Sequence, residues 1–150
     1  MPETVLLLSI HPQHGEEILA GRKTVELRKV RPRIMGEGDI VLLYFSSPEK
    51  ALVGAFCIDS IVVDEPENLW NQLGQATCVS ENNYRDYFAD SKQACGIVVD
   101  KAWRFHERIT LTELRARLPG FVPPQSFKYL RYRQVRSILA TTPITSSETM

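Results

Sequence analysis

The chain has 150 residues, the size of one domain, and 43% of them are apolar while 24% are charged. This composition excludes a largely disordered chain, and no apolar run approaches the roughly 20 residues that a membrane-spanning helix needs. The amino terminus lacks the basic stretch of a signal peptide, so we expect a cytoplasmic protein without membrane contact.

The formal net charge is zero, but the charges are strongly segregated along the chain. Residues 22–33 hold six basic residues and one acid, and residues 101–136 hold nine basic residues and two acids. Between them, residues 59–90 are acidic, with Arg85 as the one cation. If the fold brings the two basic segments together, they form a face that attracts phosphate. Otherwise the cations are scattered over a solvated surface, and the charges alone do not decide between these interpretations.

The three cysteines are Cys57, Cys78 and Cys95, and none belongs to a CxxC motif. An odd number of isolated cysteines favours free thiols in a reducing compartment over a disulfide framework, and it makes a poor zinc site. The sequence also contains no Walker loop, GxGxxG, HExxH or GxSxG motif, which excludes the commonest nucleotide, zinc and serine-hydrolase sites. We therefore expect neither a cofactor nor a metal.

The first part of the chain predicts two strands joined by a short helix. The apolar run at residues 4–10 indicates a buried strand, and a helix is expected over residues 12–20. Residues 24–28 alternate between polar and apolar side chains, which predicts a half-buried strand. On that strand Glu26 and Arg28 share one face.

The rest of the chain alternates strands and short helices. Residues 51–63 form a long predicted strand in which Gly54 indicates a bulge or sharp bend. Thr110 and Glu113 form a capping-box pattern that begins a helix. The other expected elements are, in chain order, a strand at 40–45, helices at 66–75 and 80–89, strands at 94–102 and 103–109, a helix at 110–118 and a final helix at 128–139. Short strands with few strand–helix–strand units favour an α+β fold built on a small mixed β-barrel.

The segment from Ile18 to Arg28, ILAGRKTVELR, has the most specific pattern: a helix, a basic turn, and a strand that bears Glu and Arg. It resembles the ASCH family, whose fold is like that of PUA domains. The resemblance continues at residues 38–39, 44–48, 52–56 and 124–130, and so covers most of residues 5–139. We expect a single ASCH domain over residues 1–140 and a disordered tail at 141–150.

The resemblance implies a PUA-like mixed β-barrel with flanking helices and a cleft beside the turn at residues 21–23. ASCH domains are generally proposed to bind RNA. Some relatives are described as hydrolases: one branch deacylates acetylated cytidine, and others are reported as ribonucleases.

Three polar residues lie at the expected cleft. Lys23 can contact phosphate or, if burial lowers its pKa, act as a general base; otherwise it is a solvated lysine. Glu26 can orient Lys23 while Arg28 holds a phosphate, or the two can form an ordinary surface ion pair. In the deacylase branch, the position three residues after the lysine resembles the site of a threonine nucleophile. This sequence has Glu26 at that position, and the nearby Thr24 lies two residues before it. These departures count against deacylation.

Tyr44, Lys50 and Ser126 resemble the residues to which ribonuclease activity is attributed in longer ASCH relatives. RNA cleavage needs no cofactor, because the ribose 2′-OH can attack its own phosphate while the protein transfers protons and stabilises charge. We assign phosphate stabilisation to Lys50, proton transfer to Tyr44 and positioning to Ser126. Free tyrosine and lysine titrate near ~10, so slow turnover is expected. In the alternative interpretation, Tyr44 caps the barrel and Ser126 caps the final helix.

Other side chains offer weaker evidence. The predicted final helix has Lys128, Arg131 and Arg136 with tyrosines between them, so it can follow a nucleic-acid backbone or remain an ordinary solvated helix. The three histidines lack ligand partners at suitable spacing and are expected at the surface: His11, His14 and His106. Three aromatic residues can stack on bases, but their helical spacing favours a position in the core: Trp70, Tyr84 and Tyr87.

The sequence thus leads to one preferred hypothesis and two alternatives. We prefer an RNA-binding ASCH protein with weak, metal-independent ribonuclease activity on single-stranded RNA. The residues expected to contact nucleic acid are Arg22, Lys23, Glu26, Arg28, Lys128 and Arg131. The alternatives are a non-catalytic, regulatory RNA-binding module and an amidohydrolase that deacylates a modified nucleoside such as N4-acetylcytidine. The partner is accordingly RNA, or a nucleoside or nucleotide.

Overall fold

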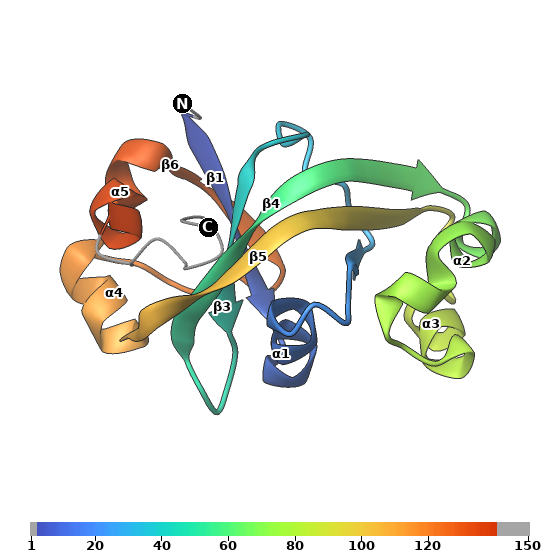
Figure 1. Ribbon diagram of the computed structural model, residues 1–150, viewed down its shortest axis with the longest axis horizontal. Helices are drawn as coiled ribbons and strands as arrows, with labels where there is room; N and C mark the ends of the chain where they lie inside the picture. The colour runs from blue at the N-terminus through green and yellow to red at the C-terminus, as the bar shows by residue number, and fades with distance from the viewer. Residues whose placement is uncertain (1–2, 141–150) are drawn as a thin grey trace, which may run out of the picture.

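One mixed sheet of six strands organises the computed structural model, which describes residues 3–140 (Figure 1). The strands are β1 Thr4–Ile10, β2 Val25–Arg28, β3 Ile40–Phe45, β4 Ala51–Asp64, β5 Ala94–Thr110 and β6 Phe127–Arg131. The helices are α1 Pro12–Leu19, α2 Pro66–Leu73, α3 Glu81–Tyr87, α4 Leu111–Arg117 and α5 Tyr132–Ala140, with a 3-10 turn, η1, at Gly74–Thr77. No helix of the described part is long and apolar enough to cross a membrane.

The strand order across the sheet is β2-β5-β4-β3-β1-β6. The pair β1–β3 is parallel, and the other four pairs are antiparallel. The long strands β4 and β5 form a twisted ribbon: α2 and α3 lie at one end of the molecule, and α4 and α5 lie at the other (Figure 1). The predicted α+β class, with a mixed sheet and flanking helices, is confirmed.

The sheet coils so that its two edge strands approach each other. The Arg28 guanidinium, on edge strand β2, donates from Nη2 to the Ser9 carbonyl at 3.1 Å and from Nη1 to the Ser126 carbonyl at 3.1 Å. Ser126 directly precedes the opposite edge strand, β6. One side chain thus joins the two edges and gives the sheet its barrel-like form.

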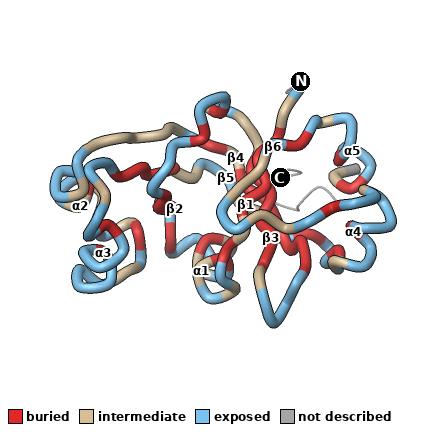
Figure 2. Tube along the Cα trace, turned by 180° about the vertical axis from the view of Figure 1, so that it is seen from behind, coloured by how far each residue is buried: buried red, intermediate tan, exposed pale blue. Residues whose placement is uncertain are grey.

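Strand β1 is buried on both of its faces, which explains its unbroken apolar sequence. Leu6 and Leu8 belong to one core cluster, and Val5 and Leu7 belong to a second cluster on the opposite face. The buried part of the chain therefore gathers where β1, β3 and β4 cross (Figure 2). A third cluster packs α2 and α3 against β2 and the adjoining ends of β4 and β5.

The two strands expected at 94–102 and 103–109 are a single strand of 17 residues, β5, so this division was wrong. Its pairing with β4 continues from Ala94 to Thr110 because register shifts near Gly54 and Ile58 absorb the bend. At Gly54 the two strands touch: a Cβ atom there would lie 2.5 Å from the Trp103 carbonyl oxygen and 2.9 Å from Leu19 Cδ2. The expected irregularity at Gly54 is confirmed.

The final helix begins at Tyr132 rather than at residue 128, so the prediction at its start was wrong. Residues 127–131 form β6, which pairs with β1 from Phe127 opposite Leu8 to Arg131 opposite Thr4. A local sequence pattern does not reveal this strand because its hydrogen-bond partner lies more than a hundred residues earlier in the chain. The capping box of Thr110 and Glu113, in contrast, begins α4 as predicted. The tail predicted at 141–150 lies outside the described residues.

Gly54→Ala should destabilise the fold, because the new methyl group must push β5 away from β4. We expect a loss of about 1–3 kcal/mol in the free energy of unfolding, typical of overpacking, measured by urea denaturation. Gly36→Ala is the matched control, since no atom lies within 4 Å of a Cβ at that position. Equal stability of both variants would contradict the close approach at Gly54.

Candidate functional site: two clefts beside the end of β1

A cleft of about 600 Å³ opens between the end of β1, α1, β2 and α3. We call it the large cleft, by contrast with a smaller cleft on the other side of Ser9. Its wall includes Lys23, Glu26 and Arg28, the residues expected beside the turn that follows α1. The other side chains that line it are Ser9, Ile10, His11, His14, Leu27, Val79, Asn83, Tyr84, Asp86 and Tyr87. A cavity of this volume can accommodate a nucleoside-sized ligand.

Lys23, Glu26 and Arg28 form a buried charged cluster at this cleft. The three residues are 2%, 5% and 8% exposed, so neither a solvated lysine nor a surface ion pair describes them. Arg28 donates to Glu26 Oε2 from Nε at 2.9 Å and from Nη2 at 2.6 Å. Lys23 Nζ lies 3.7 Å from Glu26 Oε1 and donates to the Thr77 carbonyl at 2.5 Å. The cluster is therefore largely satisfied by the protein itself.

Burial lowers the pKa of Lys23 from its usual value, while the Glu26 carboxylate opposes this shift. The burial arises because η1 covers the turn: the Thr24 N–H donates to the Ala76 carbonyl, one residue before Thr77. A lysine in this setting is closer to a general base than a solvated lysine is. The sequence could suggest this property but could not establish it, because η1 is distant in the chain.

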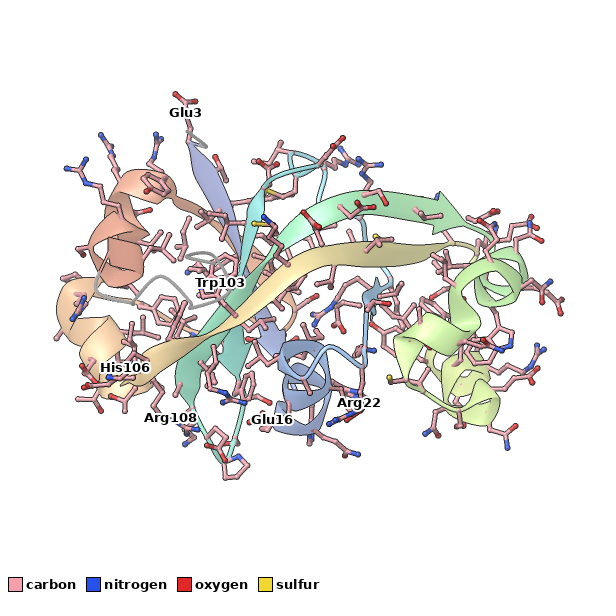
Figure 3. The ribbon with its side chains drawn as sticks, viewed as in Figure 1. Glu3, Glu16, Arg22, Trp103, His106 and Arg108 are labelled. Atoms are coloured by element: carbon pink, nitrogen blue, oxygen red, sulfur yellow. The ribbon has the colours of Figure 1, made fainter. Side chains whose placement is uncertain are left out.

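Two histidines at the start of α1 also line the large cleft. Their rings lie 6.4 Å apart, and His14 is half-buried, so the expectation that it is an ordinary surface residue was wrong. Burial is the main cause that lowers the pKa of His14, followed by the positive charge of Lys23. His106, in contrast, is exposed on β5 as expected (Figure 3). The sequence did not reveal that His11 and His14 line a cleft, because their cleft neighbours lie on β2 and α3.

The aromatic residues of α2 and α3 divide between core and cleft. Tyr84 is buried, with its ring 4.7 Å from that of Trp70 and 4.8 Å from that of Phe88, so its predicted core position is confirmed. Tyr87 is 41% exposed and lines the large cleft, so its predicted core position was wrong. The Lys29 ammonium lies 4.9 Å from the centre of the Tyr87 ring. The cleft thus has an aromatic face with a cation on it.

A second, smaller cleft of about 340 Å³ brings together Tyr44 and Lys50. Tyr44 is the penultimate residue of β3 and is buried, and Lys50 follows the polar turn after that strand. The remaining residues that line this small cleft are Ser9, Ser46, Ser47, Leu111, Pro123, Pro124 and Gln125. Two of the three residues proposed to be catalytic therefore share one cleft.

Ser126, Ser9 and Tyr44 lie side by side across the sheet, but the Ser126 side chain contacts Arg28. Ser9 pairs with Tyr44 across β1 and β3, and the Ser9 N–H donates to the Ser126 carbonyl at 2.9 Å. Two strand spacings, or about 10 Å, therefore separate the backbones at Ser126 and Tyr44. The Ser126 hydroxyl accepts a hydrogen bond from Arg28 Nη1 at 3.3 Å. It precedes a strand, so its alternative role as a helix cap was wrong.

Ser9 connects the two clefts, because it lines both of them. Its hydroxyl donates to the Pro124 carbonyl at 2.6 Å, which holds the 123–126 loop across the end of β1. A ligand in the small cleft and a ligand in the large cleft would accordingly lie on either side of one serine.

An arginine that the sequence analysis did not select lies near Tyr44. Burial raises the pKa of Tyr44, and the positive charge of Arg115 opposes the shift. Arg115 Nε donates to the Phe121 carbonyl at 3.4 Å, and the Phe121 ring lies 6.4 Å from the Tyr44 ring. Arg115 is one of two arginines on α4, and its sequence context does not distinguish it from Arg117.

The remaining predicted contacts for nucleic acid lie outside the clefts. Arg22 is at the surface beside α1 (Figure 3), where it pairs with Glu17 at 2.9 Å. The Lys128 ammonium lies 5.0 Å from the centre of the Phe121 ring, and Arg131 is exposed. Lys128 and Arg131 belong to β6 and not to the final helix, which corrects the element that we predicted for them.

Glu26→Gln should destabilise the protein strongly, because it leaves the buried charges of Lys23 and Arg28 without a counter-charge. Breaking a buried pair typically costs about 3–5 kcal/mol in the free energy of unfolding. Glu81→Gln is the control: it disrupts the exposed ion pair with Arg85 and should cost about 1 kcal/mol or less. Denaturant unfolding of both variants measures the difference, and similar losses would show that the cluster is solvated.

Comparison with known proteins places these clefts in a family context. The sequence model that defines the ASCH domain family matches residues 8–105 of this chain. The ASCH domain-containing ribonuclease of Zymomonas mobilis is 29% identical over 139 residues, which cover 91% of this chain and 90% of that protein. The alignment of the two sequences thus includes almost all of both proteins.

Solved structures agree with this relationship. The crystal structure of ASCH from Zymomonas mobilis superposes with a TM-score of 0.86 at 28% identity, covering 92% of this chain and 95% of that chain. Crystal structures of a tyrosine-to-phenylalanine and a serine-to-alanine mutant of that protein give TM-scores of 0.86 and 0.85, each at 27% identity. They cover 92% of this chain and 98% and 96% of the mutant chains. Because the family model spans well over half of the sequence and the fold agrees, the chain belongs to the ASCH domain family.

Proposed function

We propose that this protein binds single-stranded RNA and cleaves it weakly in the small cleft, without a metal. The observation that supports this most directly is the presence of Tyr44 and Lys50 in one cleft. They occur in a chain that resembles a named ribonuclease over 91% of its length. The crystallised tyrosine and serine mutants of that relative involve the same residue types as Tyr44 and Ser126.

The reaction we propose is attack of a ribose 2′ oxygen on the adjacent phosphorus. The new bond between oxygen and phosphorus forms as the bond to the 5′ oxygen breaks, which leaves a cyclic phosphate and a 5′-hydroxyl. The Lys50 ammonium stabilises the negative charge on the phosphate in the transition state. Water accepts the proton of the 2′-OH, because the described residues that line the small cleft include no histidine or carboxylate. We therefore expect slow turnover.

Tyr44 is suited to donate a proton to the leaving 5′ oxygen. Burial raises its pKa, so the phenol is protonated at neutral pH and acts as an acid rather than as a base. The Ser126 hydroxyl accepts from Arg28, which leaves its own proton available for a phosphate oxygen. We therefore assign a positioning role to Ser126.

The large cleft is the proposed site for the neighbouring nucleoside. Its volume of about 600 Å³ suits such a ligand, and the exposed ring of Tyr87 offers a surface on which a base can stack. Lys23, Glu26 and Arg28 contribute the polar wall of this site. Ser9 lies between the proposed nucleoside and phosphate sites.

The amidohydrolase alternative also has a specific observation in its favour. Lys23 lies in the large cleft with a lowered pKa, as a general base for deacylation would. Glu26 occupies the position of the expected nucleophile, and a carboxylate held by Arg28 is a poor nucleophile. We therefore prefer the ribonuclease, and include an acetylated cytidine nucleoside in the test below.

Tyr44→Phe and Lys50→Ala should each reduce RNA cleavage, because each removes a group that acts on the phosphate. We expect losses of roughly 10²–10³ in rate, the effect typical of removing one preorganised donor. Labelled single-stranded RNA, DNA of the same sequence and acetylated cytidine are incubated with each variant, and the products are resolved. Lys101→Ala, which changes an exposed lysine that lines neither cleft, is the matched control.

The substrates in that assay separate the three functions. DNA should remain uncut, because it lacks the attacking 2′-OH. Equal cleavage of DNA and RNA would exclude the proposed chemistry, and full activity of a Tyr44→Phe, Lys50→Ala double variant would exclude the small cleft. Release of acetate from acetylated cytidine without RNA cleavage would favour the amidohydrolase.

RNA affinity should weaken steeply with salt, because bound phosphates release counterions from the strand. Removing one phosphate contact by Arg131→Gln should make the slope of log affinity against log salt shallower by about 0.7. Arg85→Gln, which removes an arginine paired with Glu81, should leave the slope unchanged. Filter binding over a salt series measures both, and a salt-independent affinity would contradict RNA binding.

A further inference from the structure

A third concavity, the β6 groove, lies where β6, α5 and the loop after β2 meet. It has a volume of about 810 Å³, and Ile34, Tyr129, Arg131 and Arg133 are among the residues that line it. It shares no lining residue with the large or the small cleft. The β6 groove is thus a separate surface that the proposed cleavage chemistry does not use.

The β6 groove has an exposed aromatic ring on a firm support. Tyr129 is 37% exposed, and the edge of its ring meets the Phe127 ring at a centre-to-centre distance of 5.8 Å. Both rings lie on one face of β6, two residues apart, so the strand fixes their positions. Ile34, at 61% exposure, adds an apolar contact opposite them. A fixed, exposed ring of this kind is a platform for stacking a base.

The arginines of the β6 groove have no acidic partner in the described part of the chain, which distinguishes them from four of the other exposed arginines. Four arginines elsewhere form ion pairs with carboxylates: Arg22, Arg85, Arg104 and Arg108. Among residues 3–140, neither Arg131 nor Arg133 forms one, although Glu3 also lines the groove. Two guanidinium groups therefore remain available for an anionic ligand.

The cations of the β6 groove come from one of the two basic segments. Arg131 and Arg133 belong to the segment 101–136, while Ile34 directly follows the segment 22–33. None of the basic residues of segment 22–33 is among the residues that line the groove. Clustered cations around a stacking ring are the features that recognise single-stranded nucleic acid.

We propose that the β6 groove is a second RNA-binding surface, which holds the part of a single strand next to the part in the small cleft. This inference rests on the proposed function and extends it. Strand β6 begins directly after Ser126, beside the small cleft, and ends at Arg131, in the groove. At about 3.3 Å per residue, the path from residue 126 to 131 is about 17 Å, so only an RNA of several nucleotides can occupy both.

The length dependence of RNA affinity tests this proposal. The probes are a tetranucleotide and a dodecanucleotide of fluorescent 2′-O-methyl oligouridine, which bind like RNA but cannot be cleaved. We expect the wild-type protein to bind the dodecanucleotide at least tenfold more tightly in fluorescence anisotropy. A Tyr129→Ala, Arg133→Gln double variant should reduce this ratio to about twofold, since it removes the stacking ring and one cation.

Two further variants separate the ring from the charge and check specificity. Tyr129→Phe keeps the aromatic face and should retain the length ratio. Arg85→Gln changes an exposed arginine on α3 that lines neither the β6 groove nor the two clefts, and it serves as the control that retains the ratio. Thermal unfolding confirms that each variant is folded, which is expected because the substituted side chains are exposed.

Specific results would overturn the proposal. A length ratio in the double variant equal to that of the wild-type protein would do so, as would the absence of any ratio in the wild-type protein. Tighter binding of polyglutamate than of the dodecanucleotide would instead indicate an acidic protein partner. Cleavage of unmodified RNA is measured separately. Cleavage without a length effect refutes only this inference, and a length effect without cleavage refutes only the ribonuclease activity.

Discussion

The Arg28 guanidinium is the interaction on which the arrangement of both clefts depends. It pairs with Glu26 on its own strand and donates to the carbonyl of Ser9 and to the carbonyl and hydroxyl of Ser126. A buried guanidinium is stable only when a counter-charge and hydrogen-bond acceptors surround it. Those acceptors come from the end of β1 and from the residue before β6, so the requirement to satisfy Arg28 draws the edges of the sheet together. The large and small clefts form on the two sides of this junction, with Ser9 in both.

This constraint also divides the cations into two groups with different tasks. Lys23 and Arg28 are buried and already have partners inside the protein, so they shape the wall of the large cleft and polarise it. Lys50, Arg131 and Arg133 are exposed and have no ion-pair partner in the described part of the chain. The second group is therefore better suited to phosphate, because binding does not require that an internal contact be broken first. Strand β6 leads from the side of the small cleft, which Lys50 lines, to the β6 groove, which Arg131 and Arg133 line.

Local sequence patterns succeeded where the determining contacts are themselves local. The apolar run of β1, the α1 helix and the capping box of Thr110 all rest on neighbours within a few residues, and each is present as predicted. They failed where a distant segment decides. Residues 127–131 form a strand because β1 has an unpaired edge, and Tyr87 is exposed because α3 turns it toward β2. His14 was misplaced at the surface and Arg115 was overlooked for the same reason, since the groups with which they interact come from other elements.

The sequence by itself determined the fold class, the family resemblance, the turn that bears Lys23 and the strand that bears Glu26 and Arg28. It could do so because hydrophobic periodicity, caps and a conspicuous basic turn depend on short-range spacing. Only the tertiary structure decided that Lys23, Glu26 and Arg28 are buried and that Tyr44 and Lys50 share a cleft. It also decided that the Ser126 hydroxyl accepts a hydrogen bond from Arg28, and that Arg131 and Arg133 lie in one groove with Tyr129. These outcomes depend on strand order and register, which bring residues together that are far apart in the chain and that no local pattern relates to each other.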